Sequence, residues 1–260
     1  MFSHLGRIAI TRFSIVADII LILAQACTSF LAVLGQGRAA VRQVLLKQIY
    51  FTGLEASKII VTTAMILGTV IVAQVVSLVG DNGSLTGRIL VWVVLRELAP
   101  LLTAIIVIAR SGTAIAAELG TMKINGEIES LETMGIPCER YLILPRIIGV
   151  ATSVTILTLY FVLTAFIGSF VIASIGWHIP YGQFIQGIVS AFGFKELAML
   201  FLKSVSFGLV IPAICCSYGL SVGRSLTEIP QSATRAVITS LFAVIVLDGI
   251  ITYLFSLKFS

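Results

Sequence analysis

Four ionisable side chains fall inside long apolar segments of this sequence: Arg96, Glu97, Lys203 and Asp248. A charge at the centre of a bilayer costs about 2.5–3.5 kcal/mol on insertion scales, so unpaired positions that face lipid are disfavoured. Glu97, Lys203 and Asp248 lie about 9–12 Å from one end of their segments at the helical rise, which predicts one shared polar level. Two interpretations are compatible with it: a polar layer lining a cavity or gate for an amphiphile, or an ion-pair cluster that holds helices together.

A second polar group lies in residues 118–146, an acid-rich stretch between two apolar segments. Its apolar side chains recur at helical spacing, in the series Ile124, Ile128, Leu131 and Met134. Its glutamates lie off that stripe: Glu127, Glu129 and Glu132. Gly135 and Pro137 follow as a helix stop, so the sequence predicts a short amphipathic helix over 121–135. Anionic lipid would repel the glutamates, which favours a protein partner with a basic groove over a membrane surface.

Membrane helices must position both groups, because the composition leaves little material for a soluble core. Of 260 residues, 58% are hydrophobic and 11% are charged, and the mean hydropathy is +1.09. Soluble domains carry roughly 25% charged residues. A transmembrane helix needs about 20 mostly apolar residues. Five segments satisfy this requirement, over about 59–80, 89–110, 147–175, 197–218 and 236–256.

A further apolar segment precedes these five, over residues 13–35. Asp18 and Gln25 interrupt it, which favours a helix that lies along the membrane interface over one that crosses. Basic residues precede it, as in a signal peptide, but no A-x-A-like cleavage site closes it, so we expect it to be retained. The expected fold is an all-α integral membrane protein. Residues 1–260 form one membrane domain with an interfacial helix, five transmembrane helices and a cytoplasmic helix between the second and third spans.

The basic residues predict the orientation of the spans. Nine Lys and Arg residues lie on one side of the membrane, at positions 38, 42, 47, 58, 123, 140, 146, 224 and 235. Three lie on the other side, at positions 88, 195 and 258. The positive-inside rule therefore places 38–58, 111–146 and 219–235 in the cytoplasm and the C-terminus outside. This use of the basic residues also makes nucleic acid an unexpected partner, despite a net charge of +5.

Several kinds of chemistry lack their motifs in this chain. No G-x-x-x-x-G-K-[ST] sequence is present, so ATP binding of the P-loop type is not expected, and any ATP and Mg²⁺ would belong to a partner. Neither HExxH nor G-x-S-x-G occurs, which argues against an enzyme. The four cysteines form no CxxC, and with only two histidines we expect no metal or other cofactor in this chain.

Small residues recur at spacing four after Arg110. They form two series, which are Ala109, Thr113, Ala117 and Gly112, Ala116, Gly120. Such series let helix backbones approach closely. Packing inside the chain and a dimer interface both explain them, and the sequence does not choose. Pro100, four residues after Arg96, removes a backbone hydrogen bond from that turn and predicts a kink.

Several strings of this sequence resemble those of a known family. The strings LRELAP (95–100), RSGTAIAAELGTM (110–122) and EIESLETMGIPCERYLILPR (127–146) closely resemble those of the MlaE (YrbE-type) permeases. KSVSFG (203–208), SATRAV (232–237) and the pattern of spans extend the likeness more loosely. Those permeases are the membrane subunits of ABC systems that move lipids together with MCE-domain proteins.

The resemblance implies a role for each polar group. Residues 121–135 would be the coupling helix that docks into the ATPase subunit, through Ile124, Glu127, Ile128, Leu131, Glu132, Met134 and Gly135. The charged positions of the transport core would be Arg96, Glu97, Lys203, Arg235 and Asp248. The implied partners are the ABC ATPase, an MCE-domain protein, a small STAS-type cytoplasmic subunit, a second copy of this chain and phospholipid. The implied location is the inner membrane of a Gram-negative type of cell, where such systems maintain the outer membrane.

One position departs from the family pattern. Family members often read Asn/Asp-Pro after Met-Gly-hydrophobic, whereas here Pro137 comes one residue early and Cys138 takes the usual place of the proline. Two functions of other classes also fit the residues alone. One is a proton-coupled carrier or channel that uses Glu97, Lys203 and Asp248 as a relay. The other is a non-transporting membrane anchor for a cytoplasmic complex.

Overall fold

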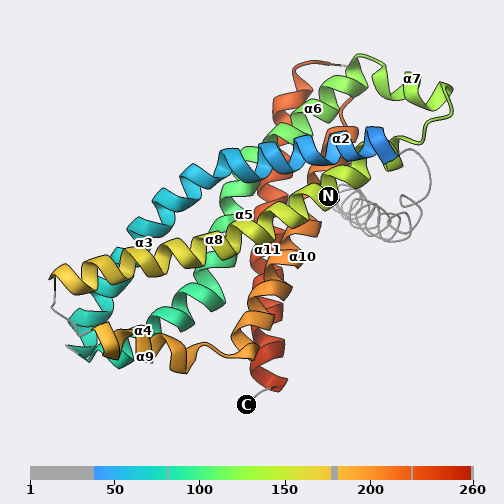
Figure 1. The fold of residues 1–260 in the computed structure, drawn as a ribbon. Coiled ribbons are helices and arrows are strands. Elements are labelled where there is room, and N and C mark those ends of the chain that lie inside the picture. Colours follow the sequence, from blue (N-terminus) through green and yellow to red (C-terminus); the bar gives the residue numbers. More distant parts are fainter. Residues whose placement is uncertain (1–37, 81, 177–180, 224, 259–260) are drawn as a thin grey trace, which may run out of the picture. The chain divides into compact units, whose positions relative to one another are not determined.

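The computed structural model describes residues 38–80, 82–176, 181–223 and 225–258, and every regular element in that part of the chain is a helix (Figure 1). The first six are α2 (Arg38–Ile49), η1 (Tyr50–Leu54), α3 (Glu55–Val79), α4 (Gly83–Leu90), η2 (Val91–Leu98) and α5 (Ala99–Val107). The next four are η3 (Ile108–Gly112), α6 (Thr113–Ile124), α7 (Glu127–Thr133) and η4 (Glu139–Ile143). The last four are α8 (Leu144–Gly176), α9 (Tyr181–Ala191), α10 (Phe194–Leu220) and α11 (Glu228–Lys258). Segments labelled η are π-helical. The all-α prediction is confirmed, and the proposed interfacial helix 13–35 lies outside the described residues.

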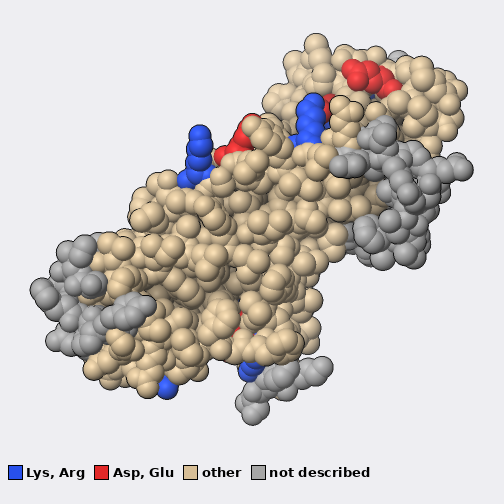
Figure 2. All heavy atoms as spheres, viewed as in Figure 1, with Lys and Arg blue, Asp and Glu red and all other residues tan. Residues whose placement is uncertain are grey.

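Five helical stretches of the described chain are long and apolar enough to cross a membrane, as predicted. They are Gln43–Val79, Gly83–Ile124, Tyr141–Val171, Phe194–Leu220 and Glu228–Leu257. Figure 2 shows the corresponding surface, on which Lys, Arg, Asp and Glu are few. Four of the stretches begin well before the predicted segments, because helix continues into the polar flanks that a hydropathy pattern excludes. At 42 residues, Gly83–Ile124 has about twice the length that the hydrocarbon layer requires.

The chain divides into two compact units, which are described separately here. Unit 1 consists of Met1–Thr52, Ile108–Ala151 and Gly208–Ala243. Unit 2 consists of Gly53–Val107, Thr152–Phe207 and Val244–Ser260. Three of the boundaries fall inside α8, α10 and α11, so each of these helices has residues in both units. That residues 1–260 act as one membrane domain stays a prediction.

Unit 2 contains a helix that the hydropathy pattern did not predict. Helix α9 occupies part of the predicted connection between the third and fourth spans, and it lies side by side with α4 (Figure 1). Glycines make the contact close: a Cβ on Gly187 would lie 2.2 Å from the backbone oxygen of Ser84, and one on Gly87 would lie 2.6 Å from that of Phe184. The exposed Arg88 adds a hydrogen bond from its Nε to Ser190 Oγ, at 3.0 Å. At 11 residues, α9 is too short to cross the bilayer.

This contact makes a prediction about stability. Replacing Gly187 with alanine should lower the free energy of unfolding by about 1–3 kcal/mol, because the added methyl group overlaps backbone that cannot move aside. The measurement is the melting temperature of the purified protein in detergent. Gly182→Ala is the matched control, since Gly182 lies in the same helix and a Cβ there meets nothing within 4 Å. Equal melting temperatures for the two variants would contradict the close α4–α9 contact.

In unit 1, one series of small residues packs inside the chain. A Cβ on Gly219 of α10 would lie 2.9 Å from the backbone oxygen of Ala116, and one on Gly120 would lie 3.1 Å from Val222 Cγ2. Gly112, Ala116 and Gly120 are all buried, and the last two of them lie in the α6–α10 contact. The residues of the other series, Ala109, Thr113 and Ala117, are exposed or half-buried. Only that second series still offers a face to another chain.

The predicted helix over 121–135 is not continuous, and this part of the prediction is wrong. Helix α6 ends at Ile124, the chain turns at Asn125 and Gly126, and α7 starts at Glu127. Gly126 has φ +72°, a left-handed conformation that glycine adopts without steric cost. Ile124 therefore belongs to a different helix from Ile128 and Leu131. The Asn-Gly pair was the sequence signal for this turn.

Candidate functional site

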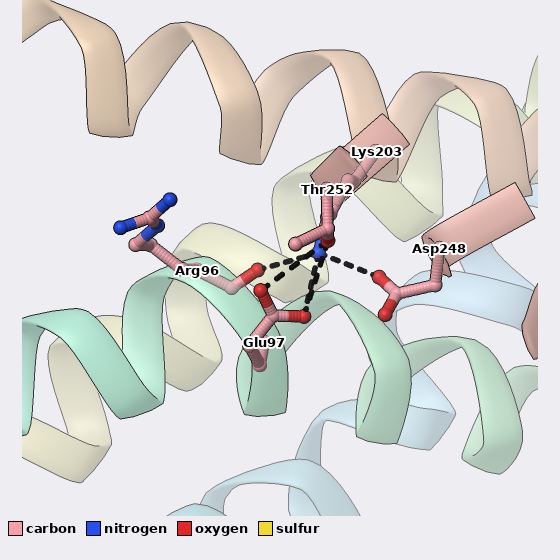
Figure 3. A network of polar contacts seen from close by, with 5 residues as sticks. All are labelled: Arg96, Glu97, Lys203, Asp248 and Thr252. Atoms are coloured by element: carbon pink, nitrogen blue, oxygen red, sulfur yellow. Dashed lines mark hydrogen bonds and ion pairs between the residues drawn. The ribbon is translucent and has the colours of Figure 1, made fainter. Parts of the chain in front are cut away.

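The ammonium group of Lys203 is the centre of a polar network in unit 2 (Figure 3). It lies 2.8 Å from Glu97 Oε2 and 2.7 Å from Asp248 Oδ1. The side chain of Lys203 is 0% exposed, whereas those of Glu97 and Asp248 are 38% and 12% exposed. The structure therefore brings together three of the predicted site residues, from η2, α10 and α11. The cluster is open to the surroundings mainly at Glu97.

The backbone of η2 supplies a third acceptor to the same ammonium group. Lys203 Nζ donates a hydrogen bond to the carbonyl oxygen of Arg96, at 2.8 Å. In an α-helix that oxygen would accept from the N–H of residue 100, but Pro100 has none. The π-helical segment ends at Leu98, two positions before this proline. Pro100 thus leaves a carbonyl oxygen available, and Lys203 uses it.

Arg96 takes part through its backbone and not through its guanidinium group. Its half-buried side chain points away from the Lys203 ammonium (Figure 3). Among the described residues, the guanidinium makes neither an ion pair nor a hydrogen bond. Arg96 is adjacent to Glu97 in η2, but the structure does not bring its guanidinium group to the Lys203 ammonium, and its place in the transport core stays a prediction. The reason is local: Arg96 and Glu97 are adjacent in a helical segment, so their side chains leave the axis in different directions.

Thr252 is a network residue that the sequence reasoning missed. Its Oγ1 lies 3.3 Å and 3.5 Å from the two carboxylate oxygens of Glu97. It follows Asp248 by four positions in α11, so both side chains face the same way. That i, i+4 spacing after an intramembrane aspartate was the signal that could have found it.

Arg235 does not belong to this network. It is exposed near the start of α11, in unit 1. It precedes Asp248, which belongs to unit 2, by thirteen positions in the sequence of α11. The prediction that Arg235 belongs to the transport core is untested by this geometry.

Helix α7 presents a different kind of surface, in unit 1. Its glutamates are exposed, at Glu127, Glu129 and Glu132, whereas Ile128 is buried and Leu131 is half-buried. Met134, at the end of the helix, has 72% of its surface exposed. The exposed part of α7 is therefore acidic with an apolar tip, which we call the α7 surface and define by Glu127, Glu129, Glu132 and Met134.

The end of α7 is fixed by a Schellman motif. Gly135 has φ +75°, its N–H donates to the carbonyl of Glu132 at 2.9 Å, and the N–H of Ile136 donates to that of Leu131 at 3.0 Å. These two bonds satisfy carbonyls that a helix end leaves without partners. The predicted stop at Gly135 and Pro137 is confirmed, and the unusual position of Pro137 does not prevent it.

No cluster of three or more His, Cys, Asp or Glu residues suited to a metal ion occurs in the described part of the chain. The chemistry that these residues can perform is charge pairing inside the spans and recognition of charged or apolar groups at α7.

Comparison with known proteins gives the chain a family. The profile of the family described as Permease MlaE matches residues 45–254. A probable ABC transporter permease protein of Synechocystis sp. is 32% identical, over 84% of this chain and 84% of that protein. The chloroplastic protein TRIGALACTOSYLDIACYLGLYCEROL 1 of Arabidopsis thaliana is 29% identical, over 81% of this chain and 61% of that protein.

A third relative, the intermembrane phospholipid transport system permease protein MlaE of Haemophilus influenzae, is 27% identical over 80% of this chain and 81% of that protein. The family profile covers both the network around Lys203 and the α7 surface, together with most of the five apolar helices. The chain is a multi-pass membrane protein that belongs to the MlaE permease family.

Proposed function

We propose that this chain is the permease subunit of an ABC-type transporter that moves phospholipid between its membrane and an MCE-domain partner. The observation that carries the proposal is the buried Lys203 ammonium, held between Glu97 and Asp248 inside apolar helices of an MlaE-family chain. Burying charge among membrane helices is costly and is typical of substrate pathways. The name of the Haemophilus influenzae relative, a phospholipid transport permease, supports phospholipid as the substrate class.

In this proposal the charged residues of the pathway have different roles. Glu97, Lys203 and Asp248 hold three helices in register, and Glu97 is the most accessible of them. The guanidinium of Arg96, on the next residue of η2, has no partner among the described residues, so it can receive a lipid phosphate. Arginine suits that role because its planar fork binds phosphate in a bidentate manner. Arg235 acts at the cytoplasmic end of the same pathway.

The remaining partners follow from the same proposal. The α7 surface docks an ABC ATPase, which binds ATP and Mg²⁺ and hydrolyses the nucleotide. A second copy of this chain completes the lipid pathway, and a small STAS-type subunit binds on the cytoplasmic side. The complex resides in the inner membrane of a Gram-negative type of envelope and helps to maintain the outer membrane.

Reconstitution tests this function directly. The complex, purified from its native membrane, is placed in liposomes that contain a fluorescent phospholipid, and transfer of that lipid to the soluble domain of the MCE partner is followed with and without ATP. We expect transfer to change with ATP and to stop with a non-hydrolysable analogue. Lipid transfer at the same rate with and without ATP, or purification of this chain without an ATPase, would contradict the proposal.

A second candidate is a proton-coupled carrier or channel. Its support is the direct contact of one ammonium and two carboxylates within the spans, since such contacts can relay protons. The same liposomes distinguish it: a carrier would show flux with this chain alone under a pH gradient, without any ATPase. The permease proposal expects no such flux.

A further inference from the structure

Helix α7 is joined to the remainder of unit 1 through α6 on one side and through residues 134–138 and η4 on the other. It has seven residues, and a two-residue turn joins it to the end of α6. Because α7 also packs against α6, a protein bound at the α7 surface acts on α6. The contacts that α6 makes near its C-terminal end determine which other helices are displaced when a protein binds.

One contact joins α6 to the end of α10. The ammonium group of Lys123 donates a hydrogen bond to the carbonyl oxygen of Leu220, the last residue of α10. The last carbonyls of a helix lack intrahelical partners and carry partial negative charge, so a lysine stabilises them. Lys123 lies three residues before Gly126, close to the turn that leads into α7.

Two neighbouring contacts keep α6 in place. Backbones approach closely where Gly219 meets Ala116, and this leaves no room for a side chain between α6 and α10. On the other side, Glu118 Oε2 pairs with Arg146 Nη2 of α8, at 2.9 Å. In this pair Arg146 is buried and Glu118 is exposed. Because its two residues belong to α6 and α8, the pair connects those helices and does not involve α10.

We propose that Lys123 is a positioning residue that links the α7 surface to α10, the helix that carries Lys203. This inference rests on the proposed permease function and deepens it. Among the three contacts, the hydrogen bond of Lys123 is the polar one that reaches α10, and it lies nearest to α7. A displacement of α7 by the docked ATPase is passed to the C-terminal end of α10 through this bond. Lys203 lies on the same continuous helix, so the displacement reaches the charged network along a single element.

The test compares Lys123→Met with the wild-type chain in the complete complex in liposomes. The variant keeps the α7 surface, so the ATPase should co-purify at the wild-type ratio and ATP hydrolysis should continue. The lipid transferred per ATP hydrolysed should fall by about fivefold, the lower end of usual coupling between sites. Lys123→Arg retains a donor of similar reach and should restore the ratio. Lys47→Met, which removes an exposed lysine of α2 in the same unit, should leave it unchanged.

Each outcome decides the question. A wild-type ratio of lipid to ATP in Lys123→Met would overturn the role of Lys123 while leaving the permease function intact. A wild-type complex that moves no lipid with ATP would instead remove the permease function itself. If Lys123→Met fails to assemble, Gly219→Ala tests the same link, because the added methyl group separates α6 from α10. A normal ratio in that variant would also overturn the inference.

Discussion

Replacing Lys203 with methionine is expected to reduce ATP-driven lipid transfer by about tenfold or more, which corresponds to about 1.4 kcal/mol or more. Methionine fills much of the same space but leaves Glu97 and Asp248 without their common partner. Removing one member of a buried ion pair costs about 3–5 kcal/mol, and the partial exposure of Glu97 puts the expected loss near the lower value. The melting temperature and the transfer rate in liposomes measure the two effects.

A charge-balanced variant separates structure from transport. The triple substitution Glu97→Gln, Lys203→Met and Asp248→Asn removes all three charges together, so it should recover most of the lost melting temperature. Transfer should remain low, because the accessible carboxylate and the held ammonium are absent. Lys58→Met, at an exposed lysine of α3, is the matched control for losing one positive charge. Full recovery of transfer in the triple variant would show that the network only holds helices together.

The second large effect is expected at the α7 surface. Met134→Asp and Glu132→Lys should each prevent the ATPase from co-purifying with this chain. Met134 is an exposed apolar tip, and truncating or charging such an anchor costs about 2 kcal/mol or more at typical interfaces. Glu132→Lys places a positive charge against the basic groove that the acidic helix predicts. Pull-down from detergent-solubilised membranes, with the ATPase quantified by mass spectrometry, measures the loss.

The control for docking lies in the connection between α10 and α11, in unit 1. Leu226 is exposed between Ser225 and Thr227, so Leu226→Asp makes the same chemical change at a site outside α7. It should leave the ATPase bound. If Met134→Asp and Glu132→Lys also leave the ATPase bound and lipid transfer unaffected, then α7 is not the coupling helix.

The sequence predicted those features that depend on composition and simple periodicity. Five apolar stretches predicted the five candidate spans. The cost of an unpaired charge in a low-dielectric medium predicted that Lys203 would pair with Glu97 and Asp248. The glycine and proline after Met134 gave the end of α7. The spans and the helix end follow from strong local preferences, and the meeting of the charges follows from the high cost of leaving a charge unpaired in an apolar medium.

The features that were missed depend on geometry that a pattern does not contain. The contact between α4 and α9 requires Gly87 and Gly187 to meet, and hydropathy says nothing about which glycines meet. The Arg96 side chain points away from Lys203 because it is adjacent to Glu97 in η2, and the depth of a charge in its segment does not specify its direction around the helix axis. The break at Gly126 was visible as an Asn-Gly pair, but the apolar spacing on both sides of it was stronger.

The Lys203 network also has a consequence for how the protein enters its membrane. Glu97 is synthesised 106 residues before Lys203, so its carboxylate is already present when the ribosome delivers α10. The insertion cost of Lys203, about 2.5–3.5 kcal/mol for a lone charge, is therefore reduced by a partner that arrived first. Asp248 comes last and meets an ammonium already in place. The three charges of the network are thus synthesised in the order Glu97, Lys203, Asp248. Lys203 and Asp248 each enter the membrane after a partner of opposite charge.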